Sequence, residues 1–301
     1  MCIRDSSFTM PSMGQMFSSD IKLGSVRDIE SSVFVRQAQI GNSDLKPAES
    51  TNTNFGLIYG NNGNRVSFDY WEIDFENRIE GQSAQALLSE DPFGPSITRN
   101  ELGDLIGVTT TYFNEESTVL SGIDYGISTV KSFFNGEVEL ILQGTNLIEF
   151  LTPEQSENGI TMINRVGKHN FDAHTHSLPK NRINTFINFK KNKSKYSLIA
   201  RYLDGYINNR TISSKALSLG YKNKVDSSLI FDISLELPIS QYLQINNNSG
   251  DYDLKTSIGI INLFDEKAPR LYNAPDFSWD SRLHDPRGRM IRVNFQLIFN
   301  N

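Results

Sequence analysis

The feature that most restricts what this chain can fold into is a regular alternation of apolar and polar residues. In the last segment, Arg292, Asn294 and Gln296 are each flanked by apolar residues, at 291, 293, 295 and 297. Successive side chains of a β-strand point to opposite faces of the sheet, so such a segment has one apolar and one polar face. The same pattern recurs at 55–59, 183–189, 196–202 and 229–237. Because runs with the period of a helix are scarce, the chain is predicted to be all-β.

Nine long strands are predicted, joined by connections that alternate between short and long. The strands run over about 53–60, 65–79, 109–130, 136–150, 181–191, 194–206, 228–244, 253–264 and 289–299. Short turns are expected at 60–64, 131–135, 192–193 and 245–252, and long loops at 81–108, 151–180, 207–227 and 265–288. Transmembrane β-barrels have short periplasmic turns and long extracellular loops. The prediction is therefore an antiparallel transmembrane β-barrel.

Composition and charge narrow the class of protein. Hydrophobic residues make up 38% of the chain, and no stretch reaches the roughly 18 apolar residues that a spanning helix requires. A barrel strand needs only about ten residues of alternating character, so composition permits a soluble all-β protein or a barrel. A net charge of -6 gives no support for a nucleic-acid partner, which requires a basic face. The single cysteine, Cys2, excludes an internal disulfide and a cysteine-based metal site.

The first 52 residues show little regular patterning, and only Val33 to Ile40 have strand character. Met1 to Ser6 lack the charged-then-apolar layout of a secretory signal. We expect 1–52 to be a truncated start followed by an irregular extracellular loop segment. Residues 53–301 are expected to form the strands of the barrel.

The predicted strand over 65–79 changes the parity of its apolar residues. They lie on one parity up to Tyr70 and on the other from Trp71 to Phe75. A β-bulge shifts parity in this way. Alternatively, Tyr70 and Trp71 lie near a membrane interface, where amphipathic rings prefer to sit, and the strand continues into water. The sequence leaves both interpretations open.

Four short segments, in order along the chain, resemble one family. Residues 7–17 (SFTMPSMGQMF) are similar to its FRAPS…LF segment, with Thr9 and Met10 where Arg and Ala are usual. Residues 41–50 (GNSDLKPAES) resemble its GNPxLKPExS segment, with Ser43 in place of Pro. The NLFD motif that ends the penultimate strand is matched by Asn262, Leu263, Phe264 and Asp265. The segment that leads into the last strand is Asp285, Pro286, Arg287, Gly288 and Arg289. The family is that of the TonB-dependent outer-membrane receptors.

The resemblance implies a barrel of 22 strands, of which residues 53–301 are the carboxy-terminal portion, a partial barrel of about nine or ten strands, and the plug domain is absent from this chain. It implies energy-coupled uptake of a scarce, bulky ligand of the siderophore-iron, cobalamin, haem or oligosaccharide class, and no enzyme activity. The implied partners are the TonB system, through a plug that is not identifiable here, the outer-membrane lipid and the barrel-assembly machinery. That machinery recognises a terminal aromatic residue, whereas Asn300 and Asn301 follow Phe299 here. The implied location is the Gram-negative outer membrane, and nine strands alone are not expected to close or transport.

Two groups of residues are candidates for ligand binding. His169, Asp172, His174 and His176 cluster in one long loop, where His-x-His beside an Asp could bind a transition metal or a ferric ligand. This spacing is not diagnostic, and a polar loop with chance histidines explains it as well, so no metal site is assigned. Arg292, Asn294 and Gln296 would face the barrel interior, where they contact a plug or ligand or simply hydrate the lumen.

Two other classes of protein remain open. The first is a plug-less, porin-like outer-membrane channel. The second is a secreted soluble β-protein, such as a carbohydrate-binding module or hydrolase, in which a second sheet would cover the apolar face of the last strand. Catalytic motifs such as G-x-S-x-G, H-E-x-x-H and the P-loop are absent, so no catalytic residue and no cofactor is predicted.

Overall fold

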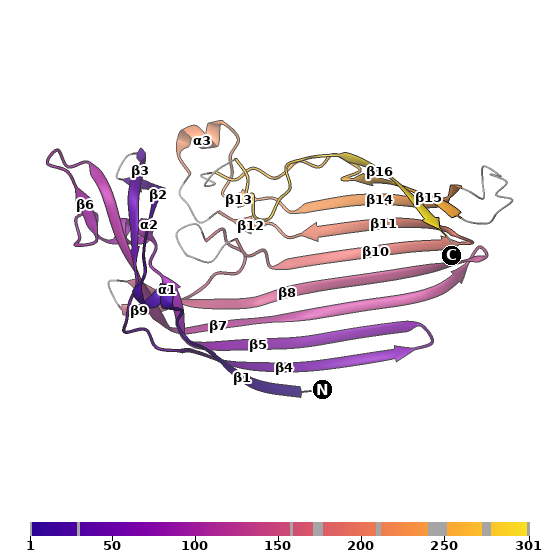
Figure 1. Cartoon of the computed structure of the whole chain (residues 1–301), viewed down its shortest axis with the longest axis horizontal. Helices are drawn as coiled ribbons and strands as arrows, with labels where there is room; N and C mark the ends of the chain where they lie inside the picture. Colours follow the sequence, from indigo (N-terminus) through magenta and orange to yellow (C-terminus); the bar gives the residue numbers. More distant parts are fainter. Residues whose placement is uncertain are drawn as a thin grey trace.

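The computed structural model describes residues 2–28, 31–156, 159–170, 177–208, 212–239, 252–272 and 278–299. Its main element is an open 14-stranded sheet, in which ten strands follow one another in a path that we call the wall (Figure 1). The wall strands, in order, are β1 (Cys2–Thr9), β4 (Ala48–Asn61), β5 (Asn64–Gly81), β7 (Leu105–Phe133), β8 (Gly136–Ser156), β10 (Asn181–Lys191), β11 (Ser194–Leu203), β14 (Ser228–Pro238), β15 (Tyr252–Ile261) and β16 (Met290–Phe299). Neighbouring wall strands are all antiparallel. The predicted all-β antiparallel fold is confirmed.

The nine predicted strands correspond to β4, β5, β7, β8, β10, β11, β14, β15 and β16. The expectation of an irregular segment over 1–52 is wrong, although the strand character expected for Val33 to Ile40 is confirmed. This segment contains β1, α1 (Met13–Phe17), β2 (Ser19–Asp28) and β3 (Ser31–Ile40). β1 pairs with β4 along its whole length, from Cys2 opposite Phe55 to Thr9 opposite Ala48. Backbone pairing needs no alternation of side chains, which is why the sequence pattern did not reveal this strand.

Short turns and long connections lie at opposite ends of the wall (Figure 1). The β4–β5 turn has Asn62 and Gly63 at φ 49° and 79°, and the β7–β8 turn has Phe134 and Asn135 at φ 44° and 58°. Positive φ at both central residues is the geometry that matches the twist of paired strands in a two-residue hairpin. Asn192 has φ 54° in the β10–β11 turn, whereas the expected turn at 245–252 lies almost wholly outside the described residues. We call this end of the wall the turn end and the other the loop end.

The strand register gives the wall one apolar and one polar face. One row of residues, each opposite the next, is wholly apolar: Leu140, Ile187, Leu198, Ile233, Ile260 and Ile291. The neighbouring row points to the other face and is mostly polar: Glu139, Asn188, Ser197, Ser234, Gly259 and Arg292. Ile291 and Phe295 on β16 are 72% and 71% exposed, so no second sheet covers this apolar face among the described residues. The soluble two-layer alternative required that cover.

The parity change in β5 is not a β-bulge. The pairing of β5 with β4 and with β7 runs through Tyr70 and Trp71 without a shift of register. The register shift within the wall occurs between β7 and β8, at Ser121 and Gly122. Trp71 therefore points to the polar face of the wall, where Gly122 leaves room for its ring: a Cβ on Gly122 would lie 2.5 Å from it.

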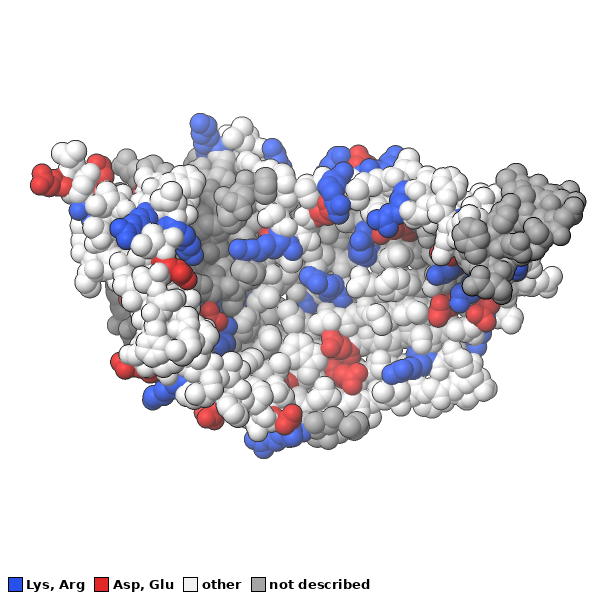
Figure 2. Space-filling model, in the orientation of Figure 1, with Lys and Arg blue, Asp and Glu red and all other residues white. Residues whose placement is uncertain are grey.

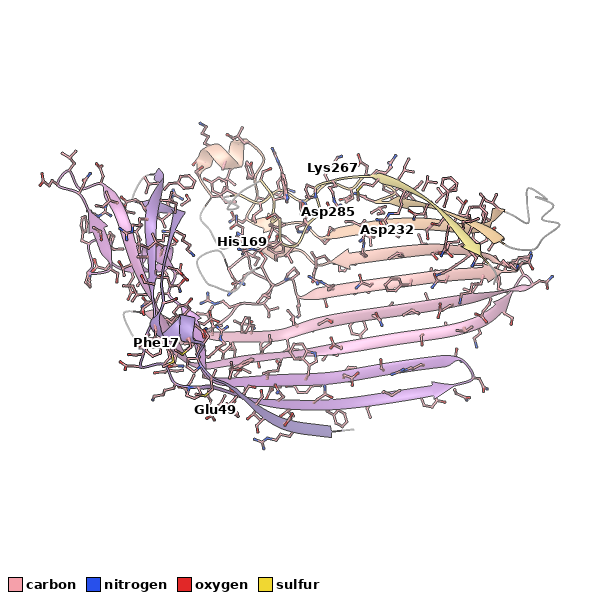
Figure 3. The ribbon with its side chains drawn as sticks, in the orientation of Figure 1. Phe17, Glu49, His169, Asp232, Lys267 and Asp285 are labelled. Carbon is pink, nitrogen blue, oxygen red and sulfur yellow. The ribbon has the colours of Figure 1, made fainter. Side chains whose placement is uncertain are left out.

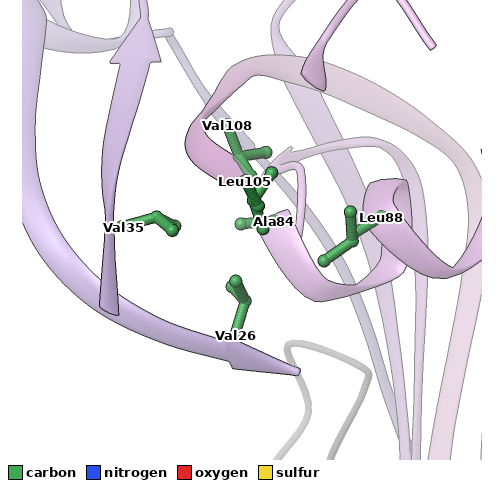
Figure 4. Close-up of a cluster of buried hydrophobic side chains, with 6 residues drawn as sticks. All are labelled: Val26, Val35, Ala84, Leu88, Leu105 and Val108. Atoms are coloured by element: carbon green, nitrogen blue, oxygen red, sulfur yellow. The ribbon is translucent and has the colours of Figure 1, made fainter. Parts of the chain in front are cut away.

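Buried apolar cores occur at the loop end. One core joins β2, β3, α2 (Ala84–Glu90) and the start of β7 through Val26, Val35, Ala84, Leu88, Leu105 and Val108 (Figure 4). The Arg99 guanidinium of β6 (Ile97–Arg99) closes it by donating two hydrogen bonds to the Asp28 carboxylate, at 2.8 and 2.7 Å. The remaining elements of this end are β9 (Gly159–Asn164), β12 (Tyr206–Ile207), α3 (Ser214–Ser218) and β13 (Lys224–Val225). None of the helices in the described ranges has the length and apolarity that crossing a membrane requires.

Candidate functional site

Three loops meet at the loop end around a single tyrosine. Tyr206 is 2% exposed and packs with Val225 of β13, with Leu271 and with Leu283. The rings of His169 and His284 both stack near Tyr206, each with its centroid 6.4 Å from that of the tyrosine ring. We call these six residues, together with Ser177 and Asp280, the loop cluster. It joins connections that are far apart in the sequence, and it therefore determines how the loops sit over the wall.

Polar contacts tie the loop cluster together. The Ser177 hydroxyl donates to the Asp280 carboxylate at 2.5 Å and lies 2.7 Å from His169 Nδ1. Since a hydroxyl has one hydrogen, and that of Ser177 goes to Asp280, Nδ1 of His169 carries a hydrogen and donates it to Ser177. A catalytic triad has the imidazole between carboxylate and hydroxyl. Here the hydroxyl stands between the other two groups, which is a structural tether and does not activate Ser177 as a nucleophile.

Burial shifts two pKa values in this cluster. It raises the pKa of the Tyr206 hydroxyl and lowers the pKa of His284, and the nearby Asp280 carboxylate partly opposes the shift of His284. A buried group keeps the form that carries no charge, so Tyr206 and His284 are both neutral near pH 7.

The first predicted binding group is only partly described. His169 is 5% exposed and lies within the loop cluster, not at the surface of a loop. Asp172, His174 and His176 lie outside the described residues. Within the described ranges, no three His, Cys, Asp or Glu residues are placed to hold a metal ion. The proposed ferric or metal contact of this segment stays a prediction.

The second predicted group lies on the polar face of the wall. Arg292, Asn294 and Gln296 are exposed on β16, and the Asn294 amide donates to the Ser257 hydroxyl at 3.3 Å. Other side chains on this face pair across strands, including Arg201 with Asp232 at 2.9 Å and Thr145 with Asp124 at 2.6 Å. In Figure 2 acidic and basic side chains lie over the middle of the strands. The face has the polarity that a hydrated ligand requires, and the role of the β16 residues stays a prediction.

The two carboxy-terminal motifs interlock beside β15 and β16. Asp265, with φ 56°, accepts a hydrogen bond from the Arg289 backbone at 2.9 Å and one from Lys267 at 2.8 Å. Gly288, with φ 70°, approaches so closely that a Cβ there would lie 2.6 Å from Asp265 Oδ1. The Asn262 side chain closes the turn at its start. Its Oδ1 accepts from the Glu266 N–H at 2.8 Å, and its Nδ2 donates to the Glu266 carbonyl at 2.9 Å. Together these contacts fix how the chain leaves β15 and enters β16.

Charges support this carboxy-terminal clamp. Hydrogen bonds from Arg287 hold the pKa of Asp285 at about 2, and the bond from Lys267 lowers the pKa of Asp265. Lys267 and Asp285 both lie on the loop-end side of β14–β16 (Figure 3). Leu263 donates its backbone N–H to Phe231 of β14 at 2.7 Å, and Phe264 packs edge-on against the Phe231 ring. Pro286 continues the turn, and Phe299 closes β16 opposite Tyr252. In the described parts of the chain, the contacts of these motif residues hold the connection between β15 and β16 in place.

The two amino-terminal motifs form a second clamp at the other edge of the wall. Ser12 begins α1 with a capping box, in which its hydroxyl accepts from the Gln15 N–H and the Gln15 side chain accepts from the Ser12 N–H. Gly41 donates to the Ser18 carbonyl at 2.7 Å, and a Cβ on it would lie 2.6 Å from the backbone of Met16. Phe17 and Glu49, one from each motif, lie at the same corner of the wall (Figure 3). The spacing of the motifs had not predicted that they meet.

Comparisons with known proteins agree with this architecture. The family model described as TonB dependent receptor-like, beta-barrel matches residues 5–263. The ferric enterobactin receptor PfeA of Pseudomonas aeruginosa (the G324V mutant) superposes with a TM-score of 0.60 at 12% identity, over 98% of this chain and 37% of that one. The siderophore receptor PirA of Acinetobacter baumannii superposes with a TM-score of 0.58 at 15% identity, over 97% of this chain and 38% of that one.

At these identities the likeness to solved structures shows the fold alone, and the chain spans little more than a third of either receptor. No curated protein matches the sequence. The family model, however, covers most of the chain, including three of the four motif segments in whole or in part. Its limits enclose the wall except for the start of β1 and the whole of β16. This chain belongs to the family of TonB-dependent receptor-like β-barrels, which are outer-membrane transport proteins.

Proposed function

We propose that this chain is part of the barrel of a TonB-dependent receptor that imports a ferric siderophore across the outer membrane. The observation that carries the proposal is the family match over residues 5–263 on a wall whose two faces differ in polarity. The apolar face meets lipid, and the polar face lines the interior through which a hydrated ligand passes. The loop end faces the outside of the cell and the turn end faces the periplasm.

The ligand class is inferred from the solved structures that superpose on this chain. Among the classes that the resemblance implies, the siderophore class is favoured because the superposing proteins are described as a ferric enterobactin receptor and a siderophore receptor. Energy comes from the TonB system through a plug domain, and folding into the membrane uses the barrel-assembly machinery. Each of these partners is a proposal for this chain.

Uptake in cells tests the proposal. Cells that express the intact receptor containing these residues take up radiolabelled ferric enterobactin, the probe, and cells with the reading frame deleted do not. Dissipating the proton gradient, or deleting TonB, abolishes the difference. Uptake of cobalamin or haem with no uptake of the siderophore would overturn the ligand class and leave the transport class in place.

A porin-like channel is the second candidate, because an open wall with a polar face is also a channel wall. It predicts uptake that is independent of TonB and a steady conductance in planar bilayers. Conductance together with TonB-independent uptake would replace the receptor proposal.

We also propose that Arg292, Asn294 and Gln296 contact the ligand or the plug from the polar face of β16. Arg292→Ala and Gln296→Ala are expected to weaken ferric-siderophore uptake. Val293→Ala, on the opposite face of the same strand, is the matched control. Equal uptake by the Arg292, Gln296 and Val293 variants would mean that the polar residues contact neither ligand nor plug and only hydrate the interior.

A further inference from the structure

The β10–β11 hairpin carries four lysines within six residues at the turn end: Lys190, Lys191, Lys193 and Lys195. Two of them have an acidic residue opposite on the polar face. Lys190 is in register with Glu137 of β8, and Lys195 is in register with Glu236 of β14. Charge on that side of the hairpin is therefore compensated.

On the apolar face the charge is not compensated. Lys191 stands opposite Ser194, and Lys131 of β7 stands opposite Val138 of β8. Both lysines are exposed. The outward-facing residues of the two hairpins at this end include no Asp or Glu: they are 129, 131, 133, 136, 138, 189, 191, 194 and 196. Two cations thus stand at the rim of a face that has no counter-charge of its own there.

Aromatic rings lie beside these lysines on the same face, because the register places Lys131, Val138, Phe189 and Tyr196 in one row across β7, β8, β10 and β11. Phe189 is two residues before Lys191, which places it about 7 Å deeper along the strand. Its ring centroid is 5.8 Å from that of Tyr196 and 6.5 Å from that of Phe133. Gly136 makes room for this ring, because a Cβ there would lie 2.6 Å from it. Such a belt of rings marks the level of lipid headgroups in membrane proteins.

A groove of about 510 Å³ continues from the rings toward the middle of the wall. Its walls are apolar and include Phe189, Tyr196, Leu198, Ile233, Leu235 and Ile258. The side chains that line it come from four adjacent strands, β10, β11, β14 and β15, so the paired backbone holds its shape. An acyl chain fits the chemistry of this groove.

We propose that the turn end of β7–β8 and β10–β11 is a binding site for one anionic glycerophospholipid of the periplasmic leaflet. Its phosphate lies between Lys131 and Lys191, its glycerol lies at the ring belt, and an acyl chain lies in the groove. The proposal uses the membrane placement of the apolar face that is stated above, and it goes beyond transport because it assigns a lipid ligand. A zwitterionic lipid can fill the groove but leaves the two ammonium groups without a net counter-charge.

Lipid retention on the purified protein tests the site. The intact receptor containing these residues is extracted in detergent and mixed with equal amounts of dioleoyl-phosphatidylglycerol and dioleoyl-phosphatidylcholine. Native mass spectrometry then counts the lipid of each kind that stays bound. Two lysines near a membrane surface predict a preference of roughly thirtyfold for phosphatidylglycerol over phosphatidylcholine.

The matched variants differ only in the face that they change. Lys131→Gln with Lys191→Gln is expected to abolish the preference, whereas Lys190→Gln with Lys195→Gln, which removes the same charge from the polar face, keeps it. Equal loss in both double variants, or no preference in the unaltered protein, would overturn the proposal. The proposal would also be overturned if another protein covers this face, because the unaltered protein and both double variants would then show the same lipid preference.

A third variant separates the groove from the lysines. Ile258→Trp fills the groove, leaves both lysines in place and is expected to lower the amount of bound phosphatidylglycerol. Unchanged retention would place the acyl chains elsewhere and overturn the groove as their site. Because no siderophore is present in these measurements, their failure is distinct from failure of the uptake assay.

Discussion

The wall and the loop end of this protein are held together in different ways. In the described parts of the chain, the buried apolar side chains lie at the loop end, and none lies in the middle of a wall strand. The wall exposes apolar residues on one face and polar residues on the other, and the backbone pairing of neighbouring strands holds it. The loop end has two small cores of the kind that a water-soluble domain has. The wall therefore needs an apolar environment around its apolar face to be stable. The loop end buries its apolar side chains in its own cores.

The clamps formed by the four motif segments lie at the boundary between these regions. Each pairs two segments that are distant in sequence, Gly41 against α1 at one edge and Gly288 against Asp265 at the other. The motifs thus fix the backbone where the chain passes from wall to loop. At that boundary the backbone is stabilised neither by contact with lipid nor by a buried core.

The largest expected effect contrasts the same substitution in the two regions. Leu271→Ala removes a side chain that is 1% exposed, and an unfilled cavity typically costs about 2–5 kcal/mol of stability. Leu297→Ala removes an exposed side chain of the wall, and lipid closes around the shortened residue without leaving a cavity. Hydrogen exchange of the loop-end amides should rise in the first variant and stay unchanged in the second. Equal effects in both would end the distinction between the two regions.

A charge placed on each face of one strand tests the two-faced wall. Ile233→Lys puts an ammonium on the apolar face at the middle of β14, where a basic residue facing lipid costs about 2–4 kcal/mol. Ser234→Lys puts the same group on the polar face and should cost well under half as much. Urea unfolding of the intact protein in lipid vesicles, followed by tryptophan fluorescence, measures both. If Ser234→Lys is the more damaging, the two faces have been assigned the wrong way round.

A smaller effect is expected at the boundary. Gly288→Ala forces a side chain into a backbone with φ 70°, which costs about 1–2 kcal/mol, and also brings its Cβ against Asp265. Gly259→Ala is the control, because the nearest atom to its Cβ is 3.6 Å away. The unfolding midpoint should fall in the first variant alone. An unaltered midpoint for Gly288→Ala would mean that the clamp does not limit stability.

The smallest effect is a pH dependence confined to the loop end. Burial lowers the pKa of His284, so the folded protein binds fewer protons than the unfolded chain once the pH falls below about 6.5, the ordinary value. The stability from neutral His284 is complete above that pH and declines below it, by at most about 1.4 kcal/mol per pH unit, because one imidazole exchanges at most one proton. Amide exchange in the loop cluster should quicken between pH 7 and pH 5, while the wall does not change.

His284→Gln isolates this group from the neighbouring His169, which also borders Asp280. The variant should flatten the pH dependence of exchange in the loop cluster. An unchanged dependence would assign the effect to another group.

The alternation of residues was enough to predict the wall but not the loop end. Nine strands, the two faces of β16 and the short turns within 60–64, 131–135 and 192–193 could be predicted, because each depends on neighbours in sequence. β1 was missed because it has few apolar residues and is held by backbone pairing with β4. β2 was not predicted, and β3 was predicted only over 33–40. The apolar side chains of both strands pack in a local core and do not line the apolar face of the wall.

The candidate binding residues show the same limit. The sequence placed His169 in an exposed loop, whereas it lies buried beside Ser177, which bonds Asp280 at a separation of 103 residues. Resemblance to a family located the motif segments, but only the coordinates showed that they pair with each other.

By itself the sequence determined that the chain forms strands with one apolar and one polar face, and where most of those strands begin and end. Tertiary structure alone decided which loops meet, which lysines lack a counter-charge and where the apolar groove lies. The physical reason is that alternation is a property of adjacent residues, whereas contacts between distant segments depend on the register of every strand between them.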